Sequence, residues 1–460
     1  MDDLNDHRAT SLRLGEVLGA LSYALDLTEG QPAGHCIRCC YIGMEIGREL
    51  QLSPEQARGL YYTLLLKDLG CSSNAARICE LYLNDDIAIK HDFKLLDGSL
   101  LQVLSFVLSH TGPQSGLSQR FRALQNILQN GTELARDVIE TRCMRGAEIA
   151  RKIRFDETVA EGIKNLDEHW DGSGKPGAIK GYSIPLYSRI ALLAQVVDVF
   201  QMAGGSEAAR REVKKRTASW FDPALAKIFE RISQRQAFWT ALNSAKLQRD
   251  IFDLEPAMHV TQVDEDYLDD IATGFAQVVD LKSPYTAGHS ERVTAYTDII
   301  SRVLKFPEER RRWLRRAALL HDIGKLGVSN AILDKPGRLT ASEWVIVKQH
   351  PTQTERILSR VKAFENLAAV AGAHHERLDG KGYPKGLKGD EIRLESRILA
   401  VADIFDALTA KRPYRSAMTV PLAFETMDKM EGVHIDANCL RALKQGFDSL
   451  VAVPADTKHK

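Results

Sequence analysis

The second half of the sequence places histidine and aspartate side chains inside segments that otherwise have the apolar spacing of buried helices. Residues 317–328, AALLHDIGKLGV, carry His321, Asp322 and Lys325 within an apolar run. A buried imidazole or carboxylate without a partner is energetically costly, and histidine with aspartate is a ligand set that suits first-row transition metals. A metal centre would remove that cost. The predicted metal ligands are His289, His321, Asp322, His350, His374, His375 and Asp403.

The number of ligands fits two metal ions, with Asp322 as the bridging and central catalytic residue. Adjacent residues on a helix diverge by about 100°, so His321 and Asp322 are not a matched pair for one ion. Two ions roughly 3.5 to 4 Å apart can share a water, lower its pKa toward about 7 and orient the resulting hydroxide for attack on phosphorus. The predicted chemistry is phosphoester hydrolysis. The first ion is assigned to His289, His321, Asp322 and Asp403, and the second to Asp322, His350, His374 and His375.

Three basic residues are candidates for holding the substrate phosphates. Lys325 lies three residues after Asp322 and therefore on the same helix face. The glycines at 324 and 327 suggest a close approach, which we assign to a phosphate in preference to a surface lysine that ends the apolar run. Arg412 and Arg415, in KRPYR, could hold the other phosphate, and solvated surface arginines explain them equally well.

The chain contains an internal repeat. ALDLTEGQPAGH, ending at His35, resembles VVDLKSPYTAGH, ending at His289, a shift of 289 − 35 = 254 that also carries Asp68 onto Asp322. Further on, residues 171–190 match residues 379–398 with a shift of 208. The first copy therefore carries about 254 − 208 = 46 additional residues, located between positions 74 and 142.

The first copy has lost most of the predicted ligands, so we expect it not to catalyse and to be a regulatory or dimerising module. Lys67 and Arg142 put fixed positive charges where cations would lie, so a phosphate-containing ligand could bind without cleavage. Pairing of Lys67 with Asp68 or Asp167 is the simpler and favoured explanation. The replaced positions are His321 by Lys67, His350 by Arg142, His374 by Leu166, His375 by Asp167, Asp403 by Gln195 and Lys325 by Cys71.

The apolar spacing around both copies is helical and strand signals are few, which predicts an all-α protein. We expect two helical bundles in tandem, residues 1–235 and 256–460, joined by a helical linker at 236–255. The seven cysteines do not form a disulfide framework, and the Cys36–Cys39 pair fits a buried core.

Charge and hydropathy exclude several classes of partner. The 460 residues contain 61 Lys plus Arg and 61 Asp plus Glu, which gives no long-range attraction to DNA, RNA or an anionic membrane. There is no apolar run long enough to cross a bilayer and no signal-peptide pattern at the start, so we expect a cytoplasmic protein.

The order H…HD…H…HH…D resembles the HD superfamily of metal-dependent phosphohydrolases. HHERLDGKGYP, residues 374–384, matches the HHExxDGxGYP signature of its HD-GYP branch at every fixed position. The resemblance implies an all-α bundle, a centre of two or three metals, and hydrolysis of cyclic dinucleotides. In the family the GYP loop borders the active site and is associated with substrate binding and partner contacts. Here that loop carries Asp379, Gly380, Gly382, Tyr383 and Pro384.

Two positions depart from the family pattern. Members with three metals carry a glutamate four residues before the first histidine, where this chain has Tyr285, so we predict two ions. The acidic residue expected before RPYR is Lys411, which leaves the substrate preference open. Iron or manganese is the expected metal, with zinc or nickel as alternatives.

These observations predict a phosphodiesterase that hydrolyses cyclic di-GMP to linear pGpG through a metal-bound hydroxide, with further cleavage to GMP left open. One alternative is hydrolysis of 3′3′-cyclic GMP-AMP or of another nucleotide by the same centre. The other is a non-catalytic signalling scaffold that acts through the GYP loop. A homodimer and a signalling-protein contact through the GYP loop are further expectations.

Overall fold

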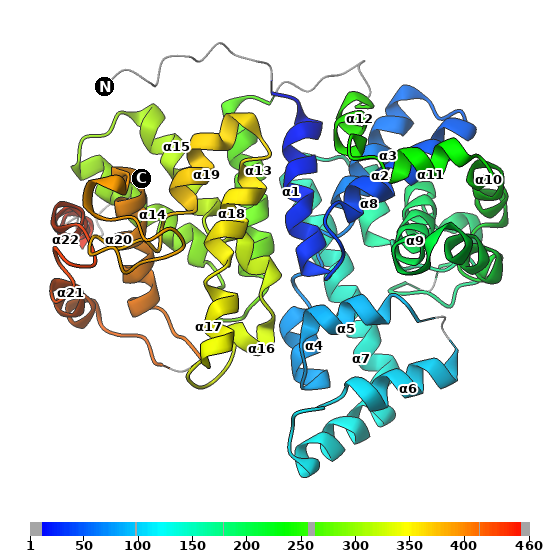
Figure 1. Ribbon diagram of the computed structural model, residues 1–460, viewed down its shortest axis with the longest axis horizontal. Coiled ribbons are helices and arrows are strands. Elements are labelled where there is room, and N and C mark those ends of the chain that lie inside the picture. The colour runs from blue at the N-terminus through cyan, green and yellow to red at the C-terminus, as the bar shows by residue number, and fades with distance from the viewer. Residues whose placement is uncertain (1–11, 97–98, 178, 256–262, 414, 452–460) are drawn as a thin grey trace, which may run out of the picture. The chain divides into compact units, whose positions relative to one another are not determined.

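The chain is helical, as the sequence predicts. The computed structural model describes residues 12–96, 99–177, 179–255, 263–413 and 415–451 (Figure 1). Within these ranges, β structure is limited to isolated bridges such as the one between Asp379 and Lys388. The all-α class is therefore confirmed.

The chain divides into two compact units, Met1–Gly274 with Ser329–Ala331, and Phe275–Val328 with Ile332–Lys460. The helices up to the first boundary are α1 (Leu14–Thr28), α2 (His35–Glu49), α3 (Pro54–Leu66), α4 (Ala75–Tyr82), α5 (Asp86–Phe93), α6 (Leu100–His110), α7 (Leu117–Lys152), α8 (Glu157–Lys164), α9 (Leu186–Arg216), α10 (Pro223–Ser233), α11 (Gln236–Leu242) and α12 (Leu247–Asp253). α13 (Glu265–Asp280) runs across that boundary.

The remaining helices follow in chain order: α14 (His289–Val303), α15 (Glu308–Leu320), α16 (Asn330–Leu333), α17 (Ala341–Val347), α18 (His350–Leu358), α19 (Glu365–Ala371), α20 (Leu394–Thr409), α21 (Val420–Asp428) and α22 (Ala437–Val451). Short 3-10 helices lie at η1 (Gly181–Ser183), η3 (Ile323–Gly327), η4 (Lys362–Phe364) and η5 (Gly389–Glu391). In the second unit, α14 packs against α15, α20 and α22, and α18 packs against η3 and α19.

The predicted linker segment, 236–255, is helical but is not one continuous helix. It forms α11 and α12, separated by residues 243–246. The side chains of Phe238, Trp239 and Ile251 are buried, and α12 packs on α2. This segment is thus part of the core of the first unit, and the division into units falls after Gly274.

The two copies of the repeat begin their central helices in the same way. α2 and α14 each start at a histidine that follows a glycine with a positive φ, 88° at Gly34 and 67° at Gly288. α2 packs on α3 and α9, as α14 packs on α15 and α20. This left-handed conformation is accessible to glycine without a steric penalty, which explains the shared AGH sequence.

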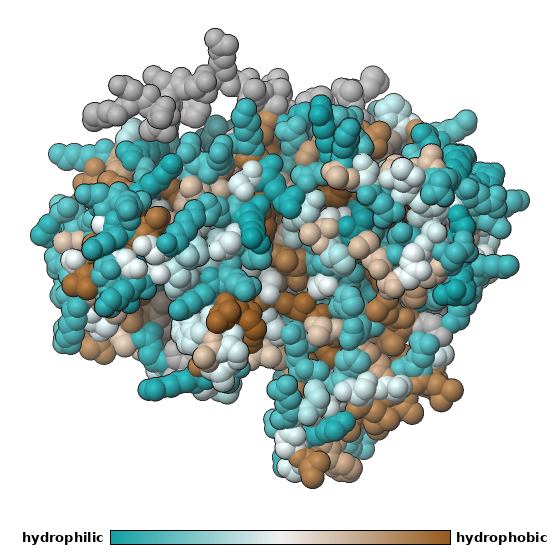
Figure 2. Space-filling view, in the orientation of Figure 1, coloured by the Kyte–Doolittle hydropathy of each residue, from teal (hydrophilic) through white to brown (hydrophobic). Residues whose placement is uncertain are grey.

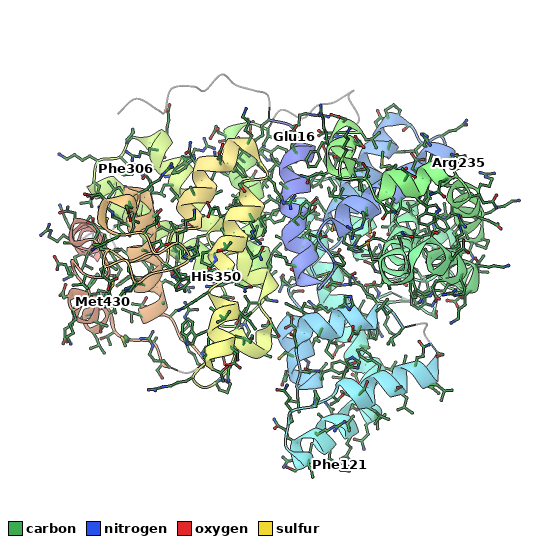
Figure 3. The ribbon with its side chains drawn as sticks, in the orientation of Figure 1. Glu16, Phe121, Arg235, Phe306, His350 and Met430 are labelled. Atoms are coloured by element: carbon green, nitrogen blue, oxygen red, sulfur yellow. The ribbon has the colours of Figure 1, made fainter. Side chains whose placement is uncertain are left out.

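The additional residues of the first copy lie within the segment that carries α4, α5, α6 and the first part of α7. The hairpin of α6 and the start of α7 is strongly apolar on its outer side, which appears brown in Figure 2. Leu101 is 81% exposed and Phe121, labelled in Figure 3, is 68% exposed.

Among the described residues, no helix combines the length and the hydropathy that a membrane span requires.

Candidate metal centre

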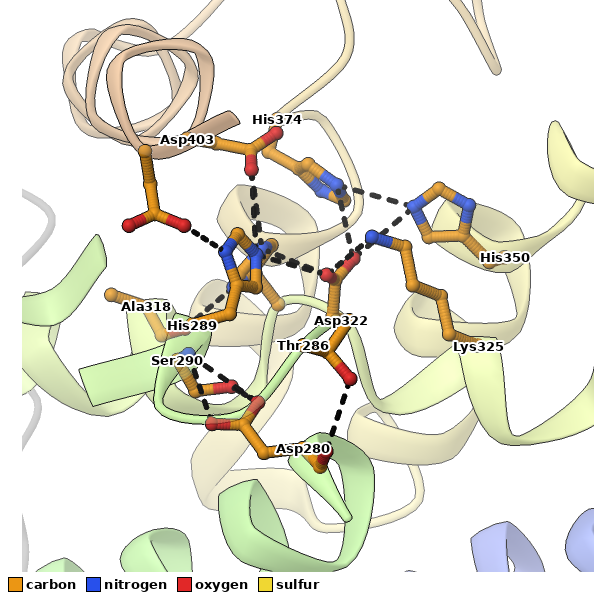
Figure 4. Close-up of polar contacts among 12 residues, drawn as sticks. Asp280, Thr286, His289, Ser290, Ala318, Asp322, Lys325, His350, His374 and Asp403 are labelled. Atoms are coloured by element: carbon orange, nitrogen blue, oxygen red, sulfur yellow. Dashed lines mark hydrogen bonds and ion pairs between the residues drawn. The ribbon is translucent and has the colours of Figure 1, made fainter. Parts of the chain in front are cut away.

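The predicted ligands come from the ends of helices and from one helix interior in the second unit, and they converge around Asp322 (Figure 4). His289 is the first residue of α14, and His350 is the first residue of α18. His321 directly follows the last residue of α15, and Asp322 directly precedes η3. These two adjacent ligands therefore lie at the junction between the α-helix and the 3-10 helix. The remaining ligands are His374 and His375, which follow α19, and Asp403, which lies within α20.

The carboxylate of Asp322 lies between two sets of imidazoles. Its Oδ2 atom is 3.3 Å from Nε2 of His289 and 3.3 Å from Nε2 of His321. Its Oδ1 atom is 3.4 Å from Nε2 of His350 and 3.7 Å from Nε2 of His374. One carboxylate thus presents one oxygen to each set, which is the arrangement expected of a ligand that bridges two ions.

Asp403 and His375 complete the cluster on the other side. Oδ1 of Asp403 is 3.5 Å from Nε2 of His289, and its Oδ2 is 3.9 Å from Nδ1 of His375. Three overlapping groups of side chains place their ligand atoms within 4.8 Å of one another: His289, His321 and Asp322; His321, His374 and Asp403; and His350, His374 and His375. Overlapping groups of this kind are compatible with more than one ion.

Three of the histidines are held with the same nitrogen facing the centre. The Nδ1 atoms of His321, His350 and His374 lie 2.6, 2.7 and 2.6 Å from the carbonyl oxygens of Ala318, Val347 and Ala371. A carbonyl oxygen only accepts, so each Nδ1 must carry the proton and donate it. Each neutral imidazole therefore presents an unprotonated Nε2, as a metal ligand must.

The electrostatics of the cluster favour ligand-ready protonation states. Burial, reinforced by the positive charge of Lys325, lowers the pKa of His350 to about 3. Burial, with His321 nearby, lowers the pKa of His374 to about 4. Burial opposes ionisation of Asp322, but the neighbouring His321 and Lys325 side chains outweigh it and hold its pKa well below the usual range. His289 is the exception: burial lowers its pKa, but the carboxylates around it outweigh burial and raise the pKa to about 9, so its ring carries a proton that a metal would displace.

A test of whether these residues fit a metal is whether the cluster leaves buried polar atoms unsatisfied. Nε2 of His289, Nε2 of His321 and Oδ1 of Asp322 are buried and have no hydrogen-bond partner among the described residues. Buried polar atoms in native proteins are nearly always paired. All three belong to the predicted ligand set and lie on both sides of the Asp322 carboxylate, so the residues fit cations there.

Lys325 points at the cluster rather than at bulk solvent. Its Nζ lies 2.5 Å from Oδ2 of Asp322, and its side chain is 18% exposed. The close approach at Gly324 has a different cause from the one we expected. A Cβ atom at Gly324 would lie 2.1 Å from the carbonyl oxygen of His350, so the glycine admits the start of α18 rather than a phosphate.

The GYP loop is anchored beside His375. The ring centroids of Tyr383 and His375 are 4.8 Å apart, and the Tyr383 amide donates to the His375 carbonyl. A Cβ atom at Gly382 would lie 2.4 Å from the amide nitrogen of Arg377, so a larger residue would collide with the backbone. Pro384 follows a cis peptide bond. Asp379 accepts from Arg377 at 2.6 Å and from the Lys381 amide, contacts that shape the loop.

The two arginines predicted to hold a phosphate lie after α20. The Arg415 guanidinium donates to the carbonyl oxygen of Ala407 at 2.5 Å, and the backbones of Arg412 and Arg415 form an isolated bridge. Among the described residues, neither guanidinium forms a hydrogen bond or ion pair with a predicted metal ligand. The backbone amide of Tyr285 donates to Ser283 Oγ. The roles of these three residues stay predictions.

Three residues that were not predicted from the sequence support the first histidine, namely Asp406, Arg292 and Asp280. Nδ1 of His289 lies 2.7 Å from Oδ2 of Asp406, and Arg292 holds the other oxygen of that carboxylate at 2.5 Å. Asp280 accepts from the amide and hydroxyl of Ser290. All three have counterparts at the repeat shifts, namely Asp198, Arg38 and Asp26. Nδ1 of His35 is 2.6 Å from Asp198, which in turn accepts from Arg38.

The first copy keeps this support but fills the ligand positions differently. Nζ of Lys67 donates to Asp68, approaches Nε2 of His35 at 3.0 Å and contacts Gln195 at 3.2 Å. Arg142 forms an ion pair with Asp167. The ammonium group of Lys67 therefore occupies the space that the ligands of a first ion would face, which agrees with the favoured explanation of that lysine.

The first unit should be acid-sensitive through His169. Its ring stacks on Trp220 at a centroid distance of 4.1 Å, and burial lowers its pKa from 6.5 to about 4. Because the folded-state pKa is depressed, the neutral form contributes stability above pH 6.5, and this is lost as the pH falls toward 4. The loss is roughly 3 kcal/mol at the limit. We expect His169→Phe to flatten the pH dependence of urea unfolding between pH 7.5 and 4.5, and an unchanged slope would contradict this assignment.

The chain belongs to the HD domain family, whose model matches residues 119–225 and 274–439. It is 52% identical over 437 residues to 3′3′-cGAMP-specific phosphodiesterase 3 of Vibrio cholerae serotype O1, covering 95% of each chain. A crystal structure described as cyclic GMP-AMP specific phosphodiesterase V-cGAP3 of V. cholerae is similar at 47% identity and a TM-score of 0.66, covering 95% of this chain and 98% of that one. A cyclic di-GMP phosphodiesterase response regulator of Xanthomonas campestris is 38% identical over 173 residues, which cover 37% of this chain and 46% of the regulator.

Proposed function

We propose that this chain hydrolyses a phosphodiester bond of 3′3′-cyclic GMP-AMP at the centre around Asp322. Hydrolysis of a cyclic dinucleotide is supported by both kinds of relative. The preference is supported by coverage, because the cGAMP-specific relative aligns with both copies and the cyclic di-GMP enzyme with little more than a third of the chain. The expected preference for cyclic di-GMP is thus less well supported than its alternative.

The observation that carries the proposal is the set of buried, unpartnered ligand atoms around one carboxylate. A scaffold that acted only through the GYP loop would have no need for a complete and desolvated ligand set. In the first copy a lysine fills the equivalent space, which supports the proposal that this copy holds no metal there and does not catalyse. We assign catalysis to the second copy alone.

Each group at the centre has a role that follows from its charge and position. Divalent metals, when bound, lower the pKa of water and stabilise charge on phosphoryl oxygens. Ionised Asp322, with one oxygen toward each histidine set, would contribute a ligand oxygen to a cation on either side. Lys325, 2.5 Å from Asp322, supplies a positive charge beside the space where a phosphate would lie. Tyr383, whose ring packs at a tilt beside His375, borders the same space.

The proposal is tested by incubating the purified full chain, loaded with iron or manganese, with equal amounts of cyclic GMP-AMP and cyclic di-GMP and separating the products by chromatography. We expect the linear product of cyclic GMP-AMP to form at least about tenfold faster, a difference of about 1.4 kcal/mol in the transition state. Faster cleavage of cyclic di-GMP would reverse the substrate assignment. Cleavage of neither, with metal present at stoichiometric amounts, would favour the scaffold.

A further inference from the structure

The first unit contains a cavity of about 320 Å³ next to the altered site of the first copy. One wall is a face of α7 that carries Ile127, Gly131, Leu134, Val138 and Arg142, spaced three or four residues apart. Other walls come from α4, α5 and α9, all labelled in Figure 1. The volume lies at the lower end of small-molecule sites, which span about 300 to 1,000 Å³.

Most of the lining is apolar or aromatic. The side chains of Tyr82, Phe93 and Trp220 face the cavity, and the aliphatic lining on α4, α5 and α9 is Ile78, Leu81, Ile89, Leu192, Val196 and Val199. An apolar space that stays unfilled loses the van der Waals contacts that a packed core would make. A bound apolar group would restore them.

The charged lining residues gather at the end beside the altered site. Lys90 donates to the carbonyl oxygen of Cys71, and Arg142 approaches the sulfur of the same residue. Glu29 forms ion pairs with Lys94 at 2.6 Å and with Lys90 at 3.8 Å.

Cations outnumber carboxylates in this lining. The lining contains four cationic side chains, from Lys90, Lys94, Arg142 and Lys175, and two carboxylates, from Glu29 and Asp167. The excess is 4 − 2 = 2 positive charges. Burial opposes ionisation of Glu29, but Lys94 and Lys90 outweigh it and lower its pKa to about 2, so the acid is charged and is already included in this balance. The polar end therefore favours an anion.

Gly131 is an independent sign that this space is kept open. It lies inside α7, a helix of 36 residues, where glycine is less favourable than alanine. A Cβ atom there would meet only the Ile127 side chain, at 3.8 Å, so packing does not require a glycine. A large side chain at this position would project into the cavity.

We propose that the first copy binds an amphipathic anion, with an acyl or aryl body against α4, α5 and α7 and an acidic head group beside Lys94 and Arg142. A cyclic dinucleotide is a poorer match, because its two ribose-phosphate units would face an apolar wall. This proposal does not rest on the substrate assigned to the second copy.

The test is titration of the full chain with 11-(dansylamino)undecanoate, followed by dansyl fluorescence. We expect one site per chain, weakened at least about tenfold by Gly131→Leu, because the new side chain takes the place of the ligand body. Gly131→Ala, and Gln129→Leu on the exposed side of the same helix, should bind within about twofold of the parent chain. Leu134→Trp fills the same space and gives a second blocking variant should Gly131→Leu not fold, as judged by circular dichroism.

Competition identifies the head group. Dodecanoate and dodecyl phosphate should both displace the probe, and the tighter competitor identifies the preferred head group as a carboxylate or a phosphate. Dodecanol should compete at least about tenfold more weakly, because it lacks the charge. Absence of probe binding to the parent chain, or equal binding by folded Gly131→Leu or Leu134→Trp, would overturn the site. Dodecanol competing as well as dodecanoate, or cyclic GMP-AMP displacing the probe completely at stoichiometric amounts, would overturn the ligand class.

Discussion

Replacing Asp322 with asparagine should lower kcat by more than about a hundredfold, because loss of an outer partner of a metal ligand already costs about 10- to 100-fold. The amide has nearly the same size but no charge, and its NH₂ group would face histidine nitrogens that now lie 3.3 to 3.4 Å from the carboxylate oxygens. Both ions should bind more weakly, since Asp322 presents an oxygen to each histidine set. The measurements are turnover of a cyclic dinucleotide and metal content by mass spectrometry on the same sample.

A control comes from Asp298, a half-buried aspartate of the second unit. Asp298, on α14, contacts Arg302, Arg311 and Arg315 and is outside the cluster. Asp298→Asn should keep turnover within about twofold. If Asp322→Asn retained two ions and normal turnover while remaining folded, the central position given to this carboxylate would be wrong.

The parts of the site that the sequence predicts are those where residue type alone carries the information. Histidines and aspartates in apolar helical segments are conspicuous because burial without partners is unfavourable, and all seven predicted ligands lie in the cluster. The helical class and the repeat follow in the same way, from apolar spacing and from matched segments. Which ion each ligand holds depends on positions in space, and that assignment stays a prediction.

The residues that the sequence did not reveal act through partners that only the fold brings close. Asp406 reads as an ordinary helix charge three residues after Asp403, yet it lies 2.7 Å from Nδ1 of His289. A usable signal existed, because Asp406 and Asp198 are related by the same shift of 208 that relates the GYP loops. The tertiary burial of Phe238 had no comparable signal, since its ring stacks on Tyr41, which lies far away in the chain.

The first copy retains the helical framework of the second copy but lacks most of its predicted metal ligands. Asp198 and Arg38 repeat the contacts of Asp406 and Arg292, so the framework that orients the first histidine is present in both copies. What differs is the group facing Nε2 of that histidine, the Lys67 ammonium in one copy and the Asp322 carboxylate in the other. Positioning and ligation are therefore separable properties of this fold.

Because positioning and ligation are separable, the second large effect on activity is expected for Asp406→Asn, which removes a positioning contact and leaves every predicted ligand in place. A charged carboxylate bound to Nδ1 makes Nε2 of His289 a stronger donor to a metal and fixes the ring, and removing that charge should reduce metal affinity or kcat by about 10- to 100-fold. Arg292 donates to the same carboxylate, and its hydrogen bond to a neutral amide would be weaker. The measurements are kcat at saturating metal and the metal concentration that gives half-maximal activity.

Asp198→Asn is the matched control, since Asp198 makes the same contact with His35 in the copy that we assign no catalysis, at 2.6 Å. It should leave kcat and the metal requirement within about twofold while lowering thermal stability to an extent similar to that of Asp406→Asn. An equal loss of activity in both variants would show that the aspartates act only through folding. Loss in the Asp406 variant alone, restored in part by raising the metal concentration, is the result that separates orientation of a ligand from support of the helix that carries it.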